Sequence, residues 1–66
     1  MKNTIKVERA KKDITQADLA DAIGVSRQTI NAMEAGKYVP STLLSLKIAR
    51  YFGVNVEDIF TLEPGD

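Results

Sequence analysis

The stretch from Thr15 to Lys37 constrains the fold more than any other part of the chain, because helix start and stop signals follow one another closely in it. Thr15 is a good N-cap residue, and Asp18 three positions later completes a pattern like a capping box. Gly24 can adopt a positive φ at little cost, which favours a tight turn. Ser26 then supplies a second N-cap. The stretch therefore predicts two short helices joined by a sharp turn.

The second of these helices, expected to cover RQTINAME and to end at Gly36, has two chemically different faces. Ile30 and Met33 are three positions apart and therefore point toward a core. At about 100° per residue, small and uncharged polar residues occupy the opposite face, with Arg27 at its N-terminal edge. These outward residues are Gln28, Asn31, Ala32 and Ala35. The exposed face thus carries hydrogen-bonding groups and no acidic residue.

The chemistry of this face suits the major groove of DNA. Arginine pairs bidentately with guanine, glutamine and asparagine pair with adenine, and alanine leaves room for close approach. A helix N-terminus also favours a nearby phosphate. We therefore expect a helix-turn-helix recognition helix whose base contacts come from Arg27, Gln28, Asn31 and Ala32. The alternative for each is an exposed residue without a role in recognition.

A family resemblance is carried by the run TQADLADAIGVSRQTINAMEAGKYVPS. This run is similar to the DNA-binding domain of the phage repressor and Cro family, the helix-turn-helix of the xenobiotic-response-element type, and to small bacterial and archaeal regulators that consist of little more than this domain. The likeness covers about residues 5–60. It implies an all-α, lambda-repressor-like fold of five short helices, forming one domain over residues 1–66 with the helix-turn-helix at 15–37.

The resemblance also implies contacts with the DNA backbone. In the family, a glutamine at the start of the first motif helix contacts a phosphate and supports the first base-reading side chain. Gln16 is therefore expected to touch the backbone and Gln28. The other expected backbone contacts are Thr29, Lys37, Tyr38 and Ser41. Thr29 could instead meet a thymine methyl group, and helix capping alone would explain Ser41.

A structural ion pair is implied in the same way. Family members pair an arginine of the first helix with a glutamate near the end of the recognition helix, which predicts a partly buried pair of Arg9 and Glu34. The alternative is that both side chains are solvated. Relatives commonly have an apolar or aromatic residue where this chain has Glu8, so the first helix departs from the family pattern there.

The remaining helices follow from N-cap residues and apolar spacing. They are expected at residues 5–12, 42–52 and 56–60, after Thr4, Ser41 and Asn55. The core face of the fourth helix is expected to consist of Ser45, Ile48, Ala49 and Phe52. At the ends, Thr61–Glu63 could pair as a short β-ribbon with Met1–Thr4, or both ends could be disordered.

The fourth helix has more apolar residues than one inward stripe needs, which suggests a dimer. A chain of 66 residues buries only about 60% of its unfolded surface and is marginal alone. We expect a homodimer interface in the C-terminal part, formed by Leu43, Leu46, Phe60 and Leu62.

Composition excludes several classes of function. There is no cysteine or histidine, which leaves neither disulfides nor the usual zinc sites, and no nucleophile–base set or glycine-rich phosphate loop indicates an enzyme. We therefore expect no catalysis, no metal, no cofactor and no small-molecule ligand. No apolar run is long enough to cross a membrane, so the default is a cytoplasmic, nucleoid-associated protein.

The charge distribution favours DNA binding by recognition rather than by charge alone. The formal net charge is +0, yet residues 1–37 carry seven basic and five acidic residues, against two and four in residues 38–66. The predicted function is a sequence-specific regulator, a repressor, that binds double-stranded DNA as a homodimer at a pseudo-palindromic operator. The neutral charge leaves two alternatives, a protein-interaction module such as an antitoxin or adaptor, and a coactivator that bridges DNA-bound factors.

Overall fold

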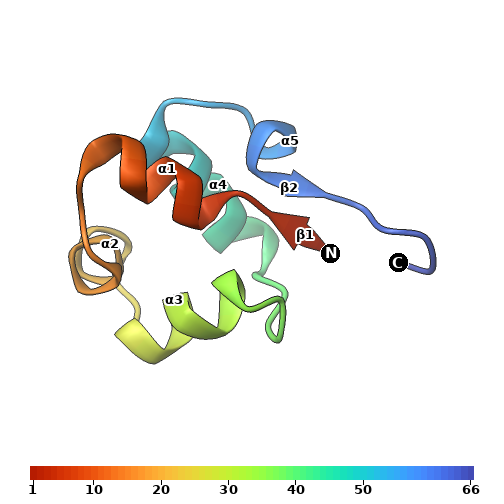
Figure 1. The fold of residues 1–66 in the computed structure, drawn as a ribbon, viewed down its shortest axis with the longest axis horizontal. Helices are drawn as coiled ribbons and strands as arrows, with labels where there is room; N and C mark the ends of the chain where they lie inside the picture. Colours follow the sequence, from red (N-terminus) through yellow and green to blue (C-terminus); the bar gives the residue numbers. More distant parts are fainter.

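The computed structural model describes residues 1–66 as five helices and two short strands around one apolar core (Figure 1). In chain order the elements are β1 (Lys2–Asn3), α1 (Ile5–Lys12), α2 (Gln16–Ile23), α3 (Arg27–Glu34), α4 (Thr42–Phe52), α5 (Val56–Ile59) and β2 (Phe60–Thr61). The helical fold with a helix-turn-helix formed by α2 and α3 is as predicted. The last helix is one residue shorter than predicted, because Phe60 leaves helical geometry and enters β2.

Side-chain caps fix the ends of α2 and α3. The N–H of Asp18 donates to Thr15 Oγ1 at 3.0 Å, and the N–H of Thr15 donates to Asp18 Oδ2 at 2.9 Å, which completes the predicted capping box. Ser26 Oγ accepts from the N–H of Thr29. Gly24 ends α2 with φ +77°, the left-handed conformation that its lack of Cβ makes accessible. These local contacts fix where α2 ends and where α3 begins.

Two predicted helix ends differ in detail. Thr4 precedes α1, but its side chain makes no capping hydrogen bond; Asn3 Oδ1 instead accepts from the N–H of Ile5 at 3.2 Å. Asn3 also donates from Nδ2 to the carbonyl of Met33 at 2.7 Å, so it joins β1 to the end of α3. The cap of α3 is Ala35, and Gly36 follows with φ +73°.

The core gathers apolar side chains from all five helices and from β2. Its fully buried members include Ile5, Leu19, Ile30, Met33, Ile48 and Ile59. On α4 the inward stripe is Leu44, Ile48 and Ala49, whereas the predicted Ser45 and Phe52 are only half-buried. The difference arises because α4 packs against both α2 and α5, which together select the face that turns inward.

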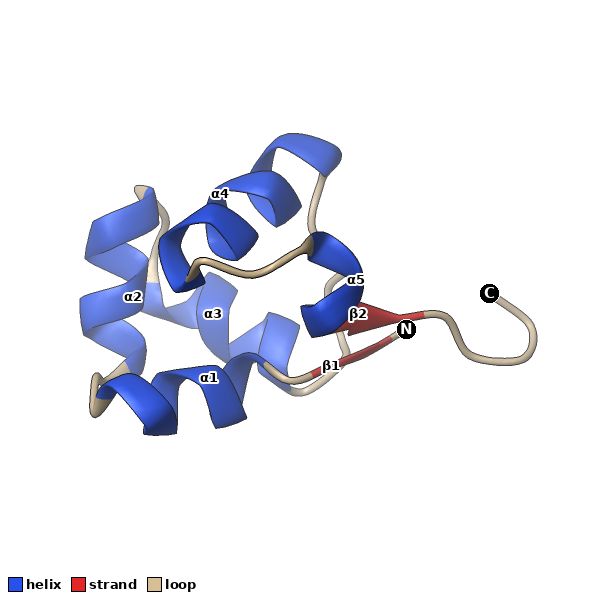
Figure 2. Cartoon of the chain, turned by 90° about the horizontal axis from the view of Figure 1, so that it is seen from above, coloured by secondary structure: helices blue, strands red, loops and turns tan.

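The two termini meet in a short antiparallel ribbon at one end of the molecule (Figures 1 and 2). Lys2 pairs with Thr61 and Asn3 pairs with Phe60, so the ribbon is present but its second strand begins one residue earlier than predicted. Beyond it, the α-amino group of Met1 lies 3.2 Å from carboxylate oxygens of both Glu63 and Asp66. No helix has both the length and the apolar character needed to cross a membrane.

Candidate nucleic-acid interface

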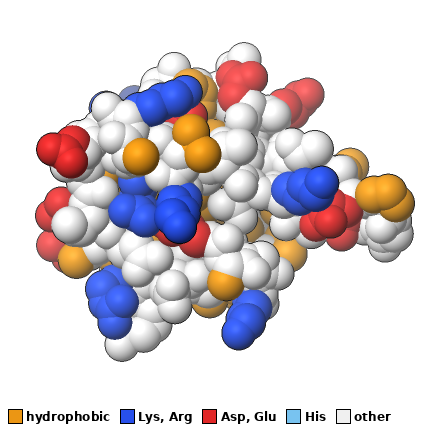
Figure 3. All heavy atoms as spheres, viewed as in Figure 1, with side chains coloured by type: hydrophobic (Ala, Val, Ile, Leu, Met, Phe, Trp, Pro, Cys, Tyr) orange, Lys and Arg blue, Asp and Glu red, His pale blue; other side chains and the backbone are white.

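The two faces of α3 differ as the sequence predicts. Ile30 and Met33 are buried in the core, while Arg27, Gln28 and Asn31 are exposed on the other side. In the space-filling view, the surface at the bottom edge, over α3, shows basic groups at both ends and mostly uncharged atoms between them (Figure 3). The acidic groups that reach the outline of this view do so at the left, top and right (Figure 3). The outer face of α3 is therefore open to an anionic partner.

A shallow hollow of about 240 Å³ lies beside α3 and is lined by Gln28, Thr29, Ala32 and Tyr38. It brings together residues that the sequence assigned separately to bases and to the DNA backbone. Tyr38 comes from the loop after α3, where Lys37 is also exposed. Recognition helix and following loop therefore form one continuous surface.

Two other predicted backbone contacts are engaged within the protein. Thr29 Oγ1 lies 2.9 Å from Ser26 Oγ at the start of α3. Ser41 Oγ accepts from the N–H of Leu44 at 3.2 Å and so caps α4. Both hydroxyls stand at helix N-termini, which is where the backbone favours a phosphate.

The ion pair predicted between α1 and α3 is present behind this surface. Arg9 Nε donates to Glu34 Oε2 at 2.6 Å and Arg9 Nη2 donates to Glu34 Oε1 at 3.0 Å, a bidentate arrangement. The two side chains are 15% and 8% exposed. Hydrogen bonding to Glu34 raises the pKa of Arg9 above its ordinary value. A third bond, from Arg9 Nη1 to the carbonyl of Ile14, ties the same guanidinium to the entry of α2.

Gln16, the first residue of α2, extends this network to the exposed face of α3. Its Nε2 lies 3.3 Å from Glu34 Oε1 and 3.3 Å from Asn31 Oδ1. The family resemblance implies that Gln16 contacts Gln28; the hydrogen bonds of its side chain go to Asn31 and Glu34 instead. The spacing of Asn31 and Glu34, three residues apart on one helix, is the sequence signal that could have indicated this partner.

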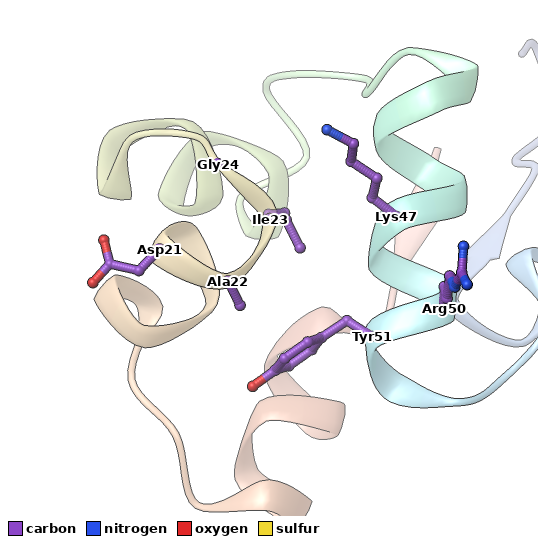
Figure 4. A pocket seen from close by; sticks show the side chains of 7 residues that line it. All are labelled: Asp21, Ala22, Ile23, Gly24, Lys47, Arg50 and Tyr51. Atoms are coloured by element: carbon purple, nitrogen blue, oxygen red, sulfur yellow. The ribbon is translucent and has the colours of Figure 1, made fainter.

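A larger hollow, of about 490 Å³, lies between the C-terminal end of α2 and α4 (Figure 4). It is lined by Asp21, Ala22, Ile23, Gly24, Lys47, Arg50 and Tyr51. No residue of α3 contributes to it, so it is separate from the outer face of α3.

A short helix with an exposed polar face, held by a tight turn against a capped preceding helix, defines the helix-turn-helix class of DNA-binding domains. The family model described as Helix-turn-helix matches residues 5–59. The chain therefore belongs to this family of DNA-binding transcriptional regulators, of the Cro/C1 type that the sequence predicted.

Relatives of the same length support this placement. The chain is 59% identical to the uncharacterized HTH-type transcriptional regulator MJ0272 of Methanocaldococcus jannaschii, with 96% of each chain covered. It is 49% identical, again over 96% of each chain, to the uncharacterized HTH-type transcriptional regulator YgzD of Bacillus subtilis. Among solved structures, the SOS-response transcriptional repressor LexA from Eubacterium rectale matches with a TM-score of 0.77 and 30% identity, over 94% of this chain and 74% of that one.

Proposed function

We propose that this protein is a sequence-specific regulator that binds double-stranded DNA and represses transcription as a homodimer on a pseudo-palindromic operator. Residues 1–66 act as one domain, and the protein works on the nucleoid in the cytoplasm. The observation that carries the proposal is the outer face of α3, which exposes Arg27, Gln28 and Asn31 and no acidic side chain. The likeness to a transcriptional repressor supports repression, since a protein bound across a promoter excludes polymerase by occupancy alone.

In this proposal, α3 lies in the major groove and the residues around it contact phosphates. The base contacts are Arg27, Gln28, Asn31 and Ala32. The backbone contacts come from the start of α2, from α3 and from the loop that follows: Gln16, Thr29, Lys37, Tyr38 and Ser41. The bases give specificity and the phosphates fix the register.

Homodimerisation is supported by apolar side chains that one chain leaves uncovered. Leu43, Leu46 and Leu62 are 64%, 54% and 75% exposed. Leu46 borders a groove of about 330 Å³ whose other apolar lining is Met1, Val39, Pro40, Val56 and Phe60. Phe60 is only 8% exposed, so it would offer an edge to the partner rather than a full ring. A two-fold dimer reads half-sites about 34 Å apart, one turn of the double helix.

Selection from a pool of randomised duplexes tests the proposal. The wild type is expected to enrich a two-fold symmetric site, and Gln28→Ala is expected to relax one position in each half-site. The enriched site should bind less tightly as salt rises, because phosphate contacts release counterions. Failure to enrich any site at low salt would overturn the proposal.

A second function is favoured by the exposed leucines and by the net charge of +0: a protein-interaction module such as an antitoxin or adaptor. A mainly apolar protein interface would show little dependence on salt, whereas DNA binding would show a steep one. Salt titration of whatever partner binds therefore separates the two.

A further inference from the structure

The polar side chains exposed on α3 differ in whether hydrogen bonds within the protein fix their orientation. Asn31 accepts a hydrogen bond from Gln16, and Gln16 is itself bonded to the buried carboxylate of Glu34. The side chains of Arg27 and Gln28 make no hydrogen bond within the protein, although they are exposed on the same helix. One base-reading position of this surface is therefore oriented before any DNA arrives, and the others are not.

The orientation of the Asn31 amide follows from the donors and acceptors behind it. A guanidinium has only donors, so Glu34, which faces Arg9, acts as an acceptor. The Gln16 atom that faces Glu34 must then be its NH₂ group. Because that group faces both Glu34 and Asn31, one of its hydrogens is available to each, and the Asn31 atom opposite it is the carbonyl oxygen. The NH₂ group of Asn31 is consequently directed away from Gln16.

We propose that Asn31 discriminates between bases more sharply than the other exposed polar residues of α3 and that Gln16 is its positioning residue. The inference rests on the proposed DNA-binding function and changes the role of Gln16 within it. Both hydrogens of the Gln16 amide are committed to Glu34 and Asn31, so neither is free for the phosphate contact that the family resemblance implies. Gln16 then affects one base position rather than the overall affinity.

The physical reason is pre-organisation. A side chain held in one orientation loses less conformational freedom on binding than a free one. Turning its amide to present a donor in place of an acceptor would also break the hydrogen bond to Gln16. Asn31 should therefore discriminate between bases more sharply than Gln28, whose longer side chain makes no hydrogen bond within the protein.

A double-mutant cycle on base preference tests the inference. The probes are the selected operator and its single-base variants at every half-site position, each measured by fluorescence anisotropy with the wild type, Gln16→Met, Asn31→Ala and Gln28→Ala. Gln16→Met retains the length of the side chain and removes its hydrogen bonds; Gln16→Ala is a second variant, and thermal melting verifies that both fold. Gln16→Met is expected to reduce discrimination about fivefold at the single position that Asn31→Ala also relaxes.

Gln16→Met is expected to cause no further loss of base discrimination when Asn31→Ala is already present. When Gln28→Ala is present instead, Gln16→Met should cause its full loss. A uniform loss of affinity across all duplexes would identify Gln16 as a backbone contact and overturn the inference alone. Persistence of the effect without Asn31, or relaxation at the Gln28 position instead, would also overturn it. If the wild type selects no operator, the proposed function and this inference fall together.

Discussion

The two ends of the molecule's long axis are built differently (Figures 1 and 2). At the end that carries α2 and α3, polar side chains are backed by buried partners, as in the pair of Arg9 and Glu34. At the end that carries β1, β2 and the C-terminal turn, the ionic contacts of Met1 with Glu63 and Asp66 involve groups in contact with water. Large apolar side chains such as Leu62 also remain exposed there.

The difference separates two kinds of surface. The helix-turn-helix is completed within one chain, because its caps and its turn are satisfied locally and its one buried carboxylate, Glu34, pairs with Arg9 of α1. The apolar surface of α4 and the tail is not completed, because no element of the same chain covers it. In our proposal the first surface meets DNA and the second meets another copy of the protein.

The largest predicted effect concerns the buried ion pair. Glu34→Ala leaves Arg9 without its carboxylate in a site where only 15% of its side chain is exposed. Breaking such a pair should lower the free energy of unfolding by about 3 kcal/mol. Urea denaturation followed by circular dichroism at neutral pH measures the change.

A matched double variant separates loss of charge pairing from loss of packing. Replacing both partners, Arg9→Met with Glu34→Met, removes the buried charges together and should stay within about 1 kcal/mol of the wild type. A loss below about 1 kcal/mol for Glu34→Ala alone would show that the pair is effectively solvated, and the contrast between the two ends would weaken.

The next effect tests the opposite surface. Leu46→Ser removes an exposed apolar group beside the groove lined by Val39 and Phe60. A two-fold interface contains the change twice. The free energy of dimerisation should therefore weaken by about 2 kcal/mol, which raises the dissociation constant about thirtyfold. Sedimentation equilibrium measures it. Lys47→Ser, next in sequence but outside the groove, is the control and should leave dimerisation unchanged. A wild type that is monomeric at tens of micromolar would contradict the dimer.

The same contrast governs what the sequence could predict. The helix-turn-helix was predictable because its signals are local: Thr15 with Asp18, Gly24 and Ser26 each determine backbone geometry within a few residues. The Arg9–Glu34 pair joins residues 25 positions apart, and it was predictable only through the family resemblance.

Features that depend on how elements meet in space were missed. Nothing near Asn3 in sequence shows that its side chain will reach the carbonyl of Met33, so Thr4 was the natural choice of cap. The inward stripe of α4 depends on α2 and α5 together, which placed Leu44 inside where Ser45 was expected. The partner of Gln16 likewise depends on the angle between α2 and α3.

A pair of glycines compares the two ends directly. Gly24 and Gly65 both have positive φ, +77° and +96°, and a Cβ added at either would meet no atom within 4 Å. Gly24→Ala should cost about 1 kcal/mol of unfolding free energy through backbone strain alone. Gly65→Ala should leave the unfolding free energy unchanged, since the exposed turn can relax. Equal losses of unfolding free energy in urea denaturation would mean that the turn at Gly65 is held as rigidly as the turn at Gly24.

The smallest effect is confined to the ribbon and depends on pH. Hydrogen bonds to Asp66 and Glu63 raise the pKa of the Met1 α-amino group above its ordinary value of 8.0. The Glu63 N–H, together with the amino group of Met1, lowers the pKa of Asp66 below its ordinary value of 3.8. The stabilising contribution of the Met1 amino group is therefore fully present below pH 8.0, and this contribution is lost as pH rises through the raised pKa. The stabilising contribution of the Asp66 carboxylate is fully present above pH 3.8, and this contribution is lost as pH falls through the lowered pKa.

The terminal contacts should consequently be intact between about pH 4 and pH 8 and weaken on either side. Hydrogen exchange reads this at the Thr4 amide, which donates to the carbonyl of Ile59, with the Val25 amide in the helix-turn-helix as reference. The protection factor of Thr4 should fall above pH 8 while that of Val25 stays constant. Acetylation of the Met1 amine removes the charge and should abolish the alkaline change. Parallel changes at both amides would mean that the ribbon opens only with the whole domain, so that the two ends would form one cooperative unit rather than two.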